Sequence, residues 1–468
     1  MSTTLPRRRT HLLPDRSFYA SPRAAMQAAR ETIAYIALND PRQGYPDAIG
    51  VIDCDTSSPT CGQLISRLEL PYAGDELHHF GWNACSRALC PYAPHPHVER
   101  RYLIVPGLRS SRIYVLDTQP DPLEPHVVKI IEPDELIART GYSRPHTVHC
   151  GPEGIYVSAL GNADGDAPGG IFLLDHNTFE PLGAWEIDRG PQRLAYDFWW
   201  HLGWDTMVTS EWGTPNTIEH GVQPELLLGK QYGQNLHFWD LKRRRHLKTA
   251  QLGEHNQFVL ELRPAHDPTR TYGFAGVTVS VEDLSSSIWM WHRAGDDWQV
   301  RNVIEIPAEP ADAELLPPLL QAFKAVPPLL TDIALSLDDQ TLYAACWGTG
   351  ELRRYDVSDP FHPQLVGSLR AGGIARPASH PTHGVLTGGP QMIELSRDGQ
   401  RLYLTNSLYL AWDEQFYPDG IQGWLARIDT RDGQLAFDPG FFIDFGERRP
   451  HQVRLEGGDA SSDSYCYP

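Results

Sequence analysis

The sequence predicts an all-β fold in which one strand–turn–strand unit recurs along the chain. Residues 335–343 read LSLDDQTLY and residues 395–403 read LSRDGQRLY, so an Asp-Asp or Asp-Gly turn separates two short strands at identical spacing. A second pattern, an apolar run that ends in Asp, occurs six times, and a seventh run ends in His292. Many short strands with regular turn signals are typical of a β-propeller, whose blades pack in a ring.

The seven apolar runs set the expected number of blades at seven. We expect each to be an outer blade strand; they lie at 48–53, 113–117, 171–175, 236–240, 288–292, 352–356 and 425–429. Inner hairpins are expected upstream of all but the first run, beginning near His78, His146, Tyr196, Val259, Asp332 and Met392. A pair of β-sandwiches would show the same alternation, but the identical spacing of the two hairpins favours the propeller.

The two ends of the chain are expected to close the ring. A last inner strand at 451–455 has no outer strand after it, and the strand at 48–53 can pair with it. Pairing of this kind removes open sheet edges. Residues 1–45 are expected to form a leader with one helical patch at 22–39, and residues 46–468 a single propeller domain.

Four insertions interrupt the repeat. They are rich in Pro, Gly and aromatic residues, and we expect them to be loops that cover one face of the ring; they span 212–234, 305–330, 370–388 and 406–424.

Composition agrees with this architecture and restricts the partners. The chain has 468 residues, with 13 Trp, 40 Gly and 39 Pro, which suits many short strands and turns. Its formal net charge of −19 argues against nucleic acid or an anionic membrane as a partner. No apolar window is long enough for a transmembrane helix.

Cysteine usage and the N-terminus indicate a cytoplasmic protein. The seven cysteines are an odd number in a chain too large to need disulfides, which favours a reducing compartment. Three arginines near the N-terminus are not followed by the apolar segment of an export signal.

The repeated hairpin also serves as a ruler for the innermost strands. Four residues before its first leucine lie Thr331 in one blade and Gln391 in the next. The same offset in the inner strand at 145–156 falls on His146, and in the last inner strand it falls on His451. Because innermost strands line the central channel of a propeller, both histidines are expected at one level of its mouth.

Three more histidines are candidates for the same point. His78 and His79 precede the first inner hairpin, and at most one of them is expected to point straight into the channel, since neighbouring strand residues face opposite sides. His149 follows His146 by three positions, so it reaches the same point only if the backbone bends. Imidazoles that converge from separate strands suit copper, zinc or iron, and nearby thiols favour copper. Most of the 20 histidines lie in polar loops, where a surface role is the simpler interpretation.

Carboxylates for proton transfer are harder to select. Glu211 ends an inner strand and is a candidate base, and Glu261 lies in an apolar run where it either faces the channel or caps a hairpin. No GxSxG, GxGxxG, CxxC or phosphate-loop motif is present.

Several segments together resemble the selenium-binding protein family, whose characterised members include methanethiol oxidases. They run in family order through most of the chain and are DELHHFGWNACS at 75–86, SSRIYV at 110–115, TSEW at 209–212, LTDI at 330–333, GGPQM at 388–392, LYLAWDEQFYPD at 408–419 and HQVRLEGGDASSD at 451–463. The resemblance implies a seven-bladed propeller. In the oxidase members it also implies copper bound by histidines, which match His78, His79, His146, His149 and His451 here.

The implied reaction is the oxidation of methanethiol by O2 and water to formaldehyde, hydrogen sulfide and hydrogen peroxide. The family's selenium-linked cysteine matches Cys61, so selenium is a second ligand to consider. A non-catalytic selenium or thiol carrier, or a scaffold that holds partners on its faces, is the alternative. A lactonase-like hydrolase with calcium would need an inward cluster of carboxylates and asparagines, whereas the channel candidates here are richer in histidine.

Overall fold

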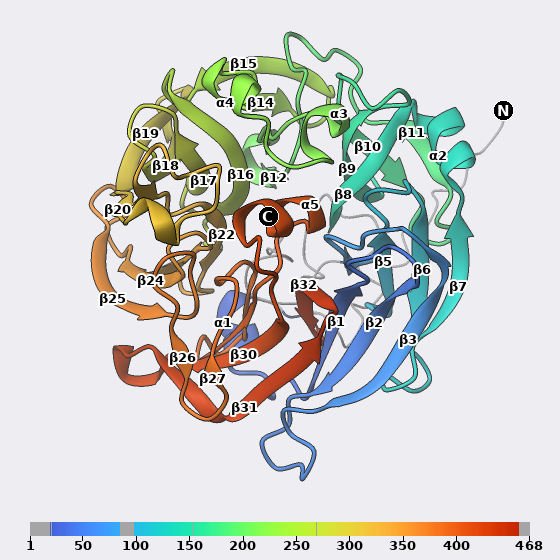
Figure 1. Cartoon of the computed structure of the whole chain (residues 1–468). Coiled ribbons are helices and arrows are strands. Elements are labelled where there is room, and N and C mark those ends of the chain that lie inside the picture. The colour runs from blue at the N-terminus through green and yellow to red at the C-terminus, as the bar shows by residue number, and fades with distance from the viewer. Residues whose placement is uncertain (1–18, 20, 85–97, 152, 268, 458–468) are drawn as a thin grey trace, which may run out of the picture.

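Seven four-stranded antiparallel sheets surround a central channel, as the sequence predicts (Figure 1). The structure is a computed structural model that describes residues 19, 21–84, 98–151, 153–267 and 269–457. Each sheet is one blade, and its four strands follow one another in order from the channel to the outside. The all-β, seven-bladed prediction is therefore confirmed.

The innermost strands bring the candidate site residues to the channel. They are β4 (Gly81–Trp82), β8 (Tyr142–Cys150), β12 (Phe198–His201), β16 (Asn256–Pro264), β22 (Leu330–Leu335), β28 (Ile393–Leu395) and β32 (Arg449–Leu455). The second strands are β5 (Tyr102–Pro106), β9 (Ile155–Asn162), β13 (Thr206–Thr209), β17 (Tyr272–Ser280), β23 (Thr341–Cys346), β29 (Arg401–Thr405) and β1 (Ile33–Asn39).

The seven apolar runs lie in the third strands of the blades, not in the outermost ones. These strands are β2 (Pro46–Asp53), β6 (Ile113–Asp117), β10 (Gly170–Leu174), β14 (Asn235–Asp240), β18 (Ser286–Ala294), β24 (Glu351–Asp356) and β30 (Gly423–Asp429). A fourth strand lies outside each: β3 (Leu64–Ala73), β7 (His126–Ile131), β11 (Pro181–Ala184), β15 (Arg245–Gln251), β19 (Asp297–Ile306), β25 (Gln364–Arg370) and β31 (Ala436–Gly446). These outer strands have more exposed and more polar faces, so an apolar pattern does not reveal them.

The recurring aspartate has a local structural role. In six blades it begins the turn from the third to the fourth strand, and its Oδ1 accepts a backbone N–H two or three residues later; the six are Asp53, Asp117, Asp175, Asp240, Asp356 and Asp429. Aspartate favours such turns because its short side chain can reach the backbone just ahead of it. The pattern thus marks a turn, which is why it repeats with the blades.

Ring closure involves more of the N-terminal segment than the sequence suggests. The strand beside β32 is β1, which pairs with β32 from Ala34 opposite Leu455 to Asn39 opposite Arg449, and β2 pairs with β1 in turn. The expected helix at 22–39 is confined to α1 (Pro22–Met26). The ring therefore takes in residues from the expected leader, and one blade joins three N-terminal strands to the C-terminal strand. Every residue of β1 is buried. The segment therefore lacks the alternation of apolar and polar residues that would distinguish a strand from a helix in the sequence.

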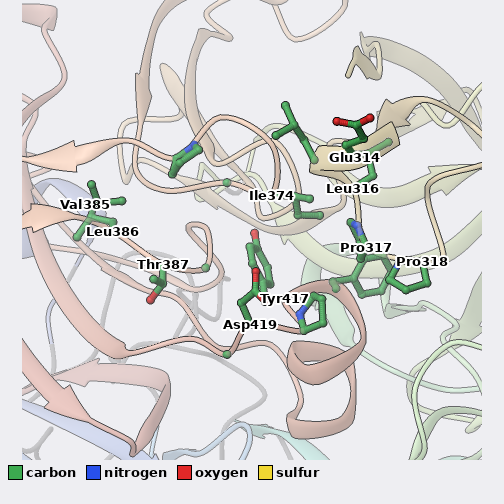
Figure 2. Close-up of a pocket in the computed structure, with 17 residues that line it drawn as sticks. Glu314, Leu316, Pro317, Pro318, Ile374, Val385, Leu386, Thr387, Tyr417 and Asp419 are labelled. Atoms are coloured by element: carbon green, nitrogen blue, oxygen red, sulfur yellow. The ribbon is translucent and has the colours of Figure 1, made fainter. Parts of the chain in front are cut away.

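The insertions gather over one face of the ring. They carry α3 (Pro215–Ile218), α4 (Pro224–Leu228), β20 (Glu309–Pro310), β21 (Ala325–Val326), β26 (Ser379–His380), β27 (Gly384–Val385) and α5 (Leu410–Phe416), while α2 (Pro133–Thr140) leads into β8. In Figure 1, α5 lies over the centre of the ring. Three of the insertions enclose a cavity of about 350 Å³, with Leu316, Ile374 and Tyr417 among the side chains that line it (Figure 2). Within the described residues, no helix has the length and apolar character to cross a bilayer.

Replacement of Asp175 by Ala should destabilise the protein by about 1–3 kcal/mol, because its carboxylate accepts N–H groups from Asn177 and Thr178, both at 2.8 Å. These backbone hydrogen bonds lower the pKa of Asp175. The stabilisation is therefore present above the ordinary carboxyl pKa of about 4 and is lost as the pH falls through the lowered value. Chemical denaturation at pH 7 and at pH 2.5 measures this difference. Equal stability of the wild type and Asp175→Ala at pH 7, with the exposed Asp296→Ala as control, would contradict it.

Candidate metal centre

Bulges in the innermost strands place His146 and His451 at equivalent positions. In β8 the register shifts between Pro145 and Val148, and in β32 it shifts where the strand passes Ile36 and Leu38 of β1. A bulge bends its strand and redirects the side chain at the bend. A register shift at Thr331 in β22 occupies the same offset, so the ruler's assignment of a shared register is confirmed.

Both His78 and His79 contribute rings to the same cluster. They lie between the isolated bridge at Leu77 and the start of β4, outside any strand, so strand alternation does not govern them. Their rings are stacked, with centroids 5.0 Å apart. The expectation that at most one of the pair points inward is therefore wrong, and the reason is the irregular backbone that precedes β4.

Four imidazoles meet at the channel. The ring centroids of His78 and His451 are 3.6 Å apart, those of His79 and His146 are 4.1 Å apart, and those of His78 and His146 are 4.9 Å apart. One ligand nitrogen from each of His78, His79 and His146 lies within 4.8 Å of the others. Nitrogens bound to one ion at about 2.0–2.1 Å are at most about 4.2 Å apart, so a small side-chain adjustment closes the set around an ion.

Burial keeps these rings uncharged. All four are at most 3% exposed. Burial and the neighbouring imidazoles hold the pKa of His78, His79 and His146 well below the usual value, and burial lowers the pKa of His451 to about 3. Neutral imidazoles carry the lone pairs that metal ligation requires.

The hydrogen bonds around the cluster direct those lone pairs inward. Nδ1 of His451 lies 2.8 Å from the Ser407 carbonyl oxygen, which can only accept, so Nδ1 carries the proton and Nε2 the lone pair. Nδ1 of His146 lies 2.9 Å from the Thr147 hydroxyl. The second ring nitrogen of a metal-binding histidine commonly has such a partner.

The donor set fits a metal ion. Nε2 of His79, His146 and His451 are buried and have no hydrogen-bond partner. Leaving a buried polar atom unsatisfied costs about 1–3 kcal/mol, and native proteins avoid it. One ion among these nitrogens would satisfy all of them, and imidazole nitrogen suits copper, zinc, iron and nickel.

A buried carboxyl group adjoins the cluster. Oε1 of Glu261, in β16, lies 3.7 Å from Nε2 of His79 and accepts a hydrogen bond from the Tyr196 hydroxyl at 3.0 Å. Its Oε2 lies 3.0 Å from Arg263. Burial raises the pKa of Glu261 to about 8, although Arg263 acts in the opposite direction.

Aromatic side chains enclose the cluster. Tyr196 contacts His146 at a centroid distance of 4.3 Å, and Trp212 lies 6.4 Å from His78. Tyr409, just before α5, lies 6.0 Å from His78 and packs on Trp212. The insertions therefore cover the channel mouth with aromatic rings.

An apolar cavity of about 290 Å³ lies beyond this aromatic cover. Trp412 of α5 lines it and packs on Trp212, with ring centroids 5.8 Å apart. Small apolar molecules can be accommodated there, and Trp412 connects this cavity to Trp212.

Two of the sequence candidates, His149 and Glu211, lie apart from these contacts. The ring of His149 packs at a tilt of 34° against Trp199, with centroids 3.9 Å apart, and its Nε2 lies 3.5 Å from Asp197. Glu211 is hydrogen-bonded to His237 and to the backbone of β14. The bend that brings His146 to the channel precedes His149, which has resumed regular pairing opposite Tyr156.

Cys61 occupies the loop between β2 and β3, the third and fourth strands of its blade. Its half-buried thiol lies 3.9 Å from Arg427. The channel histidines and Cys61 therefore lie in different parts of the propeller. Cys85, Cys90 and Cys466 lie outside the described residues.

Two residues of the site were not selected from the sequence. Tyr196 begins the inner hairpin of its blade, at the level where His146 begins its own. Ser407 contributes only its backbone carbonyl, and no side-chain pattern marks such a partner.

Comparisons with known proteins identify the family. The family model described as 56kDa selenium binding protein matches residues 13–466. Methanethiol oxidase of Rattus norvegicus is 38% identical over 95% of this chain and 97% of its own length, and selenium-binding protein 2 of Mus musculus is also 38% identical over the same shares.

A solved structure agrees closely in shape. A hypothetical selenium-binding protein from Sulfolobus tokodaii superimposes with a TM-score of 0.94 at 56% identity, covering 97% of this chain and 99% of that one. The periplasmic gluconolactonase of Pseudomonas aeruginosa, at 10% identity and a TM-score of 0.56, shares the fold alone. A match over nearly the whole chain, in sequence and in structure, shows that this chain belongs to the 56kDa selenium-binding protein family.

Proposed function

We propose that this protein is a copper-dependent thiol oxidase that converts methanethiol, O2 and water into formaldehyde, hydrogen sulfide and hydrogen peroxide. The observation that carries the proposal is the buried cluster of four imidazoles, three of which bring a nitrogen within 4.8 Å of one another. Nε2 of His79, His146 and His451 has no hydrogen-bond partner. The curated relatives named methanethiol oxidase, at about 38% identity over nearly the full chain, support this type of enzyme.

The reaction balances without a further reactant. CH3SH, O2 and H2O give CH2O, H2S and H2O2: the carbon–sulfur bond breaks, the carbon loses two electrons, and O2 gains two electrons and two protons. Copper, when bound by His78, His79, His146 and His451, would supply one-electron chemistry and favour the thiolate form of the substrate.

The protein's own residues position the substrate and receive its proton. Trp212 and Tyr196 form an apolar wall that suits the methyl group and excludes water. Oε1 of Glu261 lies beside the cluster. We assign this carboxyl group as acceptor of the proton that leaves the methyl carbon, in the ionised form that is populated as the pH rises toward and above its raised pKa of about 8. Glu211, the candidate from sequence, is engaged with His237 instead.

We place the protein in the cytoplasm. In the described part of the chain Cys54, Cys61 and Cys346 are free thiols, which supports a reducing compartment.

A second candidate function is selenium or thiol carriage at Cys61. Its thiol is half-buried next to Arg427, and a relative is named selenium-binding protein 2. Carriage without catalysis predicts selenium uptake that Cys61→Ser abolishes, and no release of hydrogen peroxide on addition of methanethiol.

Removal of a cluster imidazole should abolish both copper binding and oxidation. His146→Ala and His451→Ala each delete one ligand, and we expect copper affinity to fall at least about 100-fold, since loss of an outer partner alone costs 10–100-fold. Copper per chain and oxygen consumption with methanethiol measure the effect, and the exposed His362→Ala is the matched control. Full copper occupancy and full activity in both cluster variants would refute the assignment.

Glu261→Gln should separate catalysis from metal binding. Glutamine keeps the size of the side chain but cannot take up the substrate proton, so we expect kcat to fall by about 10²- to 10⁴-fold with copper content unchanged. The exposed Glu254→Gln is the control. Wild-type kcat in Glu261→Gln would remove this residue from the mechanism.

A further inference from the structure

A second group of histidines lies in the outer half of another blade. His237 of β14 and His246 of β15 face each other, with Nδ1 of His237 3.0 Å from Nε2 of His246. The Thr249 hydroxyl lies 3.2 Å from each of these two nitrogens. Three potential ligand atoms thus form a triangle with sides of 3.0–3.2 Å, held by the pairing of two neighbouring strands.

Glu211 fixes the orientation of His237. Oε1 of Glu211 lies 2.8 Å from Nε2 of His237, while its Oε2 accepts the backbone N–H of Gln234 and two N–H groups of Asn235. Because a carboxylate anchored in this way accepts hydrogen bonds, Nε2 of His237 carries the proton and Nδ1 presents its lone pair to His246. In metal sites, the ring nitrogen that does not bind the ion commonly donates its proton to a carboxylate. Glu211 has this position relative to His237.

Packing holds the second ring in place. His246 lies over Gly190, where an added Cβ would come within 2.8 Å of the ring. On another side it meets the edge of Trp239 at a centroid distance of 5.2 Å. His237 is 2% exposed, and His246 is half-buried, so the triangle has one accessible side.

We propose that His237 Nδ1, His246 Nε2 and Thr249 Oγ1 form a binding site for a divalent transition metal such as zinc, with Glu211 as the outer partner of His237. Ligands held at about 2.0–2.1 Å and tetrahedral angles are about 3.3–3.4 Å apart, close to the spacing of the triangle. The site is separate from the channel cluster and independent of the oxidase proposal. An ion there would link β14 to β15.

A surface pocket leaves the fourth coordination position open. His237, Thr249 and Glu211 line a hollow of about 890 Å³ that Arg193 and Lys230 also border. These two cations favour an anionic or neutral oxygen ligand at the open position, such as hydroxide, water or a small carboxylate. An open position of this kind is typical of metal sites that exchange ligands.

Calorimetric titration of the full-length metal-free protein with zinc chloride tests the proposal. We expect His246→Ala to bind one zinc ion fewer per chain than the wild type, and Glu211→Gln to bind at this site 10- to 100-fold more weakly. His146→Ala, which disrupts the channel cluster, should keep the peripheral site, and the exposed His362→Ala should match the wild type.

Thermal melting provides a second readout that also reports folding. Zinc should raise the Tm of His146→Ala, and this rise should be absent in the double variant His146→Ala/His246→Ala. The proposal would be overturned if the wild type and His246→Ala bound the same number of zinc ions per chain and zinc raised the Tm of His146→Ala and of the double variant equally. Loss of zinc only in His146→Ala would assign all binding to the channel and overturn it equally.

Discussion

The pairing of β1 with β32 is the contact on which the channel cluster depends. β32 is the last strand described and carries His451, and its blade is completed by three strands from the other end of the chain. Without β1 the C-terminal strand would have no neighbour within its blade. The ring closure therefore fixes His451 against His78, whose segment follows the fourth strand of the same blade.

Polar side chains then lock neighbouring blades together around the channel. Asp332 accepts the backbone N–H of Ile393 at 2.7 Å, Glu394 accepts that of Leu455 at 2.7 Å, and Asp197 accepts that of Leu262 at 2.8 Å. Each bond runs from one innermost strand to the next. Buried carboxylates are costly unless paired, and here backbone N–H groups and Arg263 or Arg454 compensate them. Inner strands locked in this way hold His146 and His451, while His78 and His79 lie in the segment that leads into β4.

The sequence was sufficient for the architecture because blade repetition has a local cause. Asp175 and its equivalents repeat since each begins the same turn, and the hairpin ruler works since bulges recur at the same offset. His146 and His451 could therefore be paired from sequence. The rest depended on features without periodicity: the irregular backbone at His78 and His79, the all-buried strand β1, and the direction in which Glu211 and Glu261 point.

Glu211 and Glu261 show this limit most clearly. Both are buried acids, Glu211 just after β13 and Glu261 within β16, and no spacing rule distinguishes their roles. Only the structure shows that Glu261 faces His79 while Glu211 faces His237. Glu211, the candidate base from the sequence, contacts His237 instead of the channel. His237 in turn lies against His246, which is why Glu211 enters the proposal for a second metal site.

The central claim is that one copper ion binds among the channel imidazoles. X-ray absorption spectroscopy of the copper-loaded protein, combined with anomalous diffraction at the copper edge, tests it most directly. The account predicts a single strong peak between His78, His79, His146 and His451, with a first shell of three or four nitrogens at about 2.0 Å. A strong copper peak at Cys61 with sulfur in the first shell, and none in the channel, would contradict it.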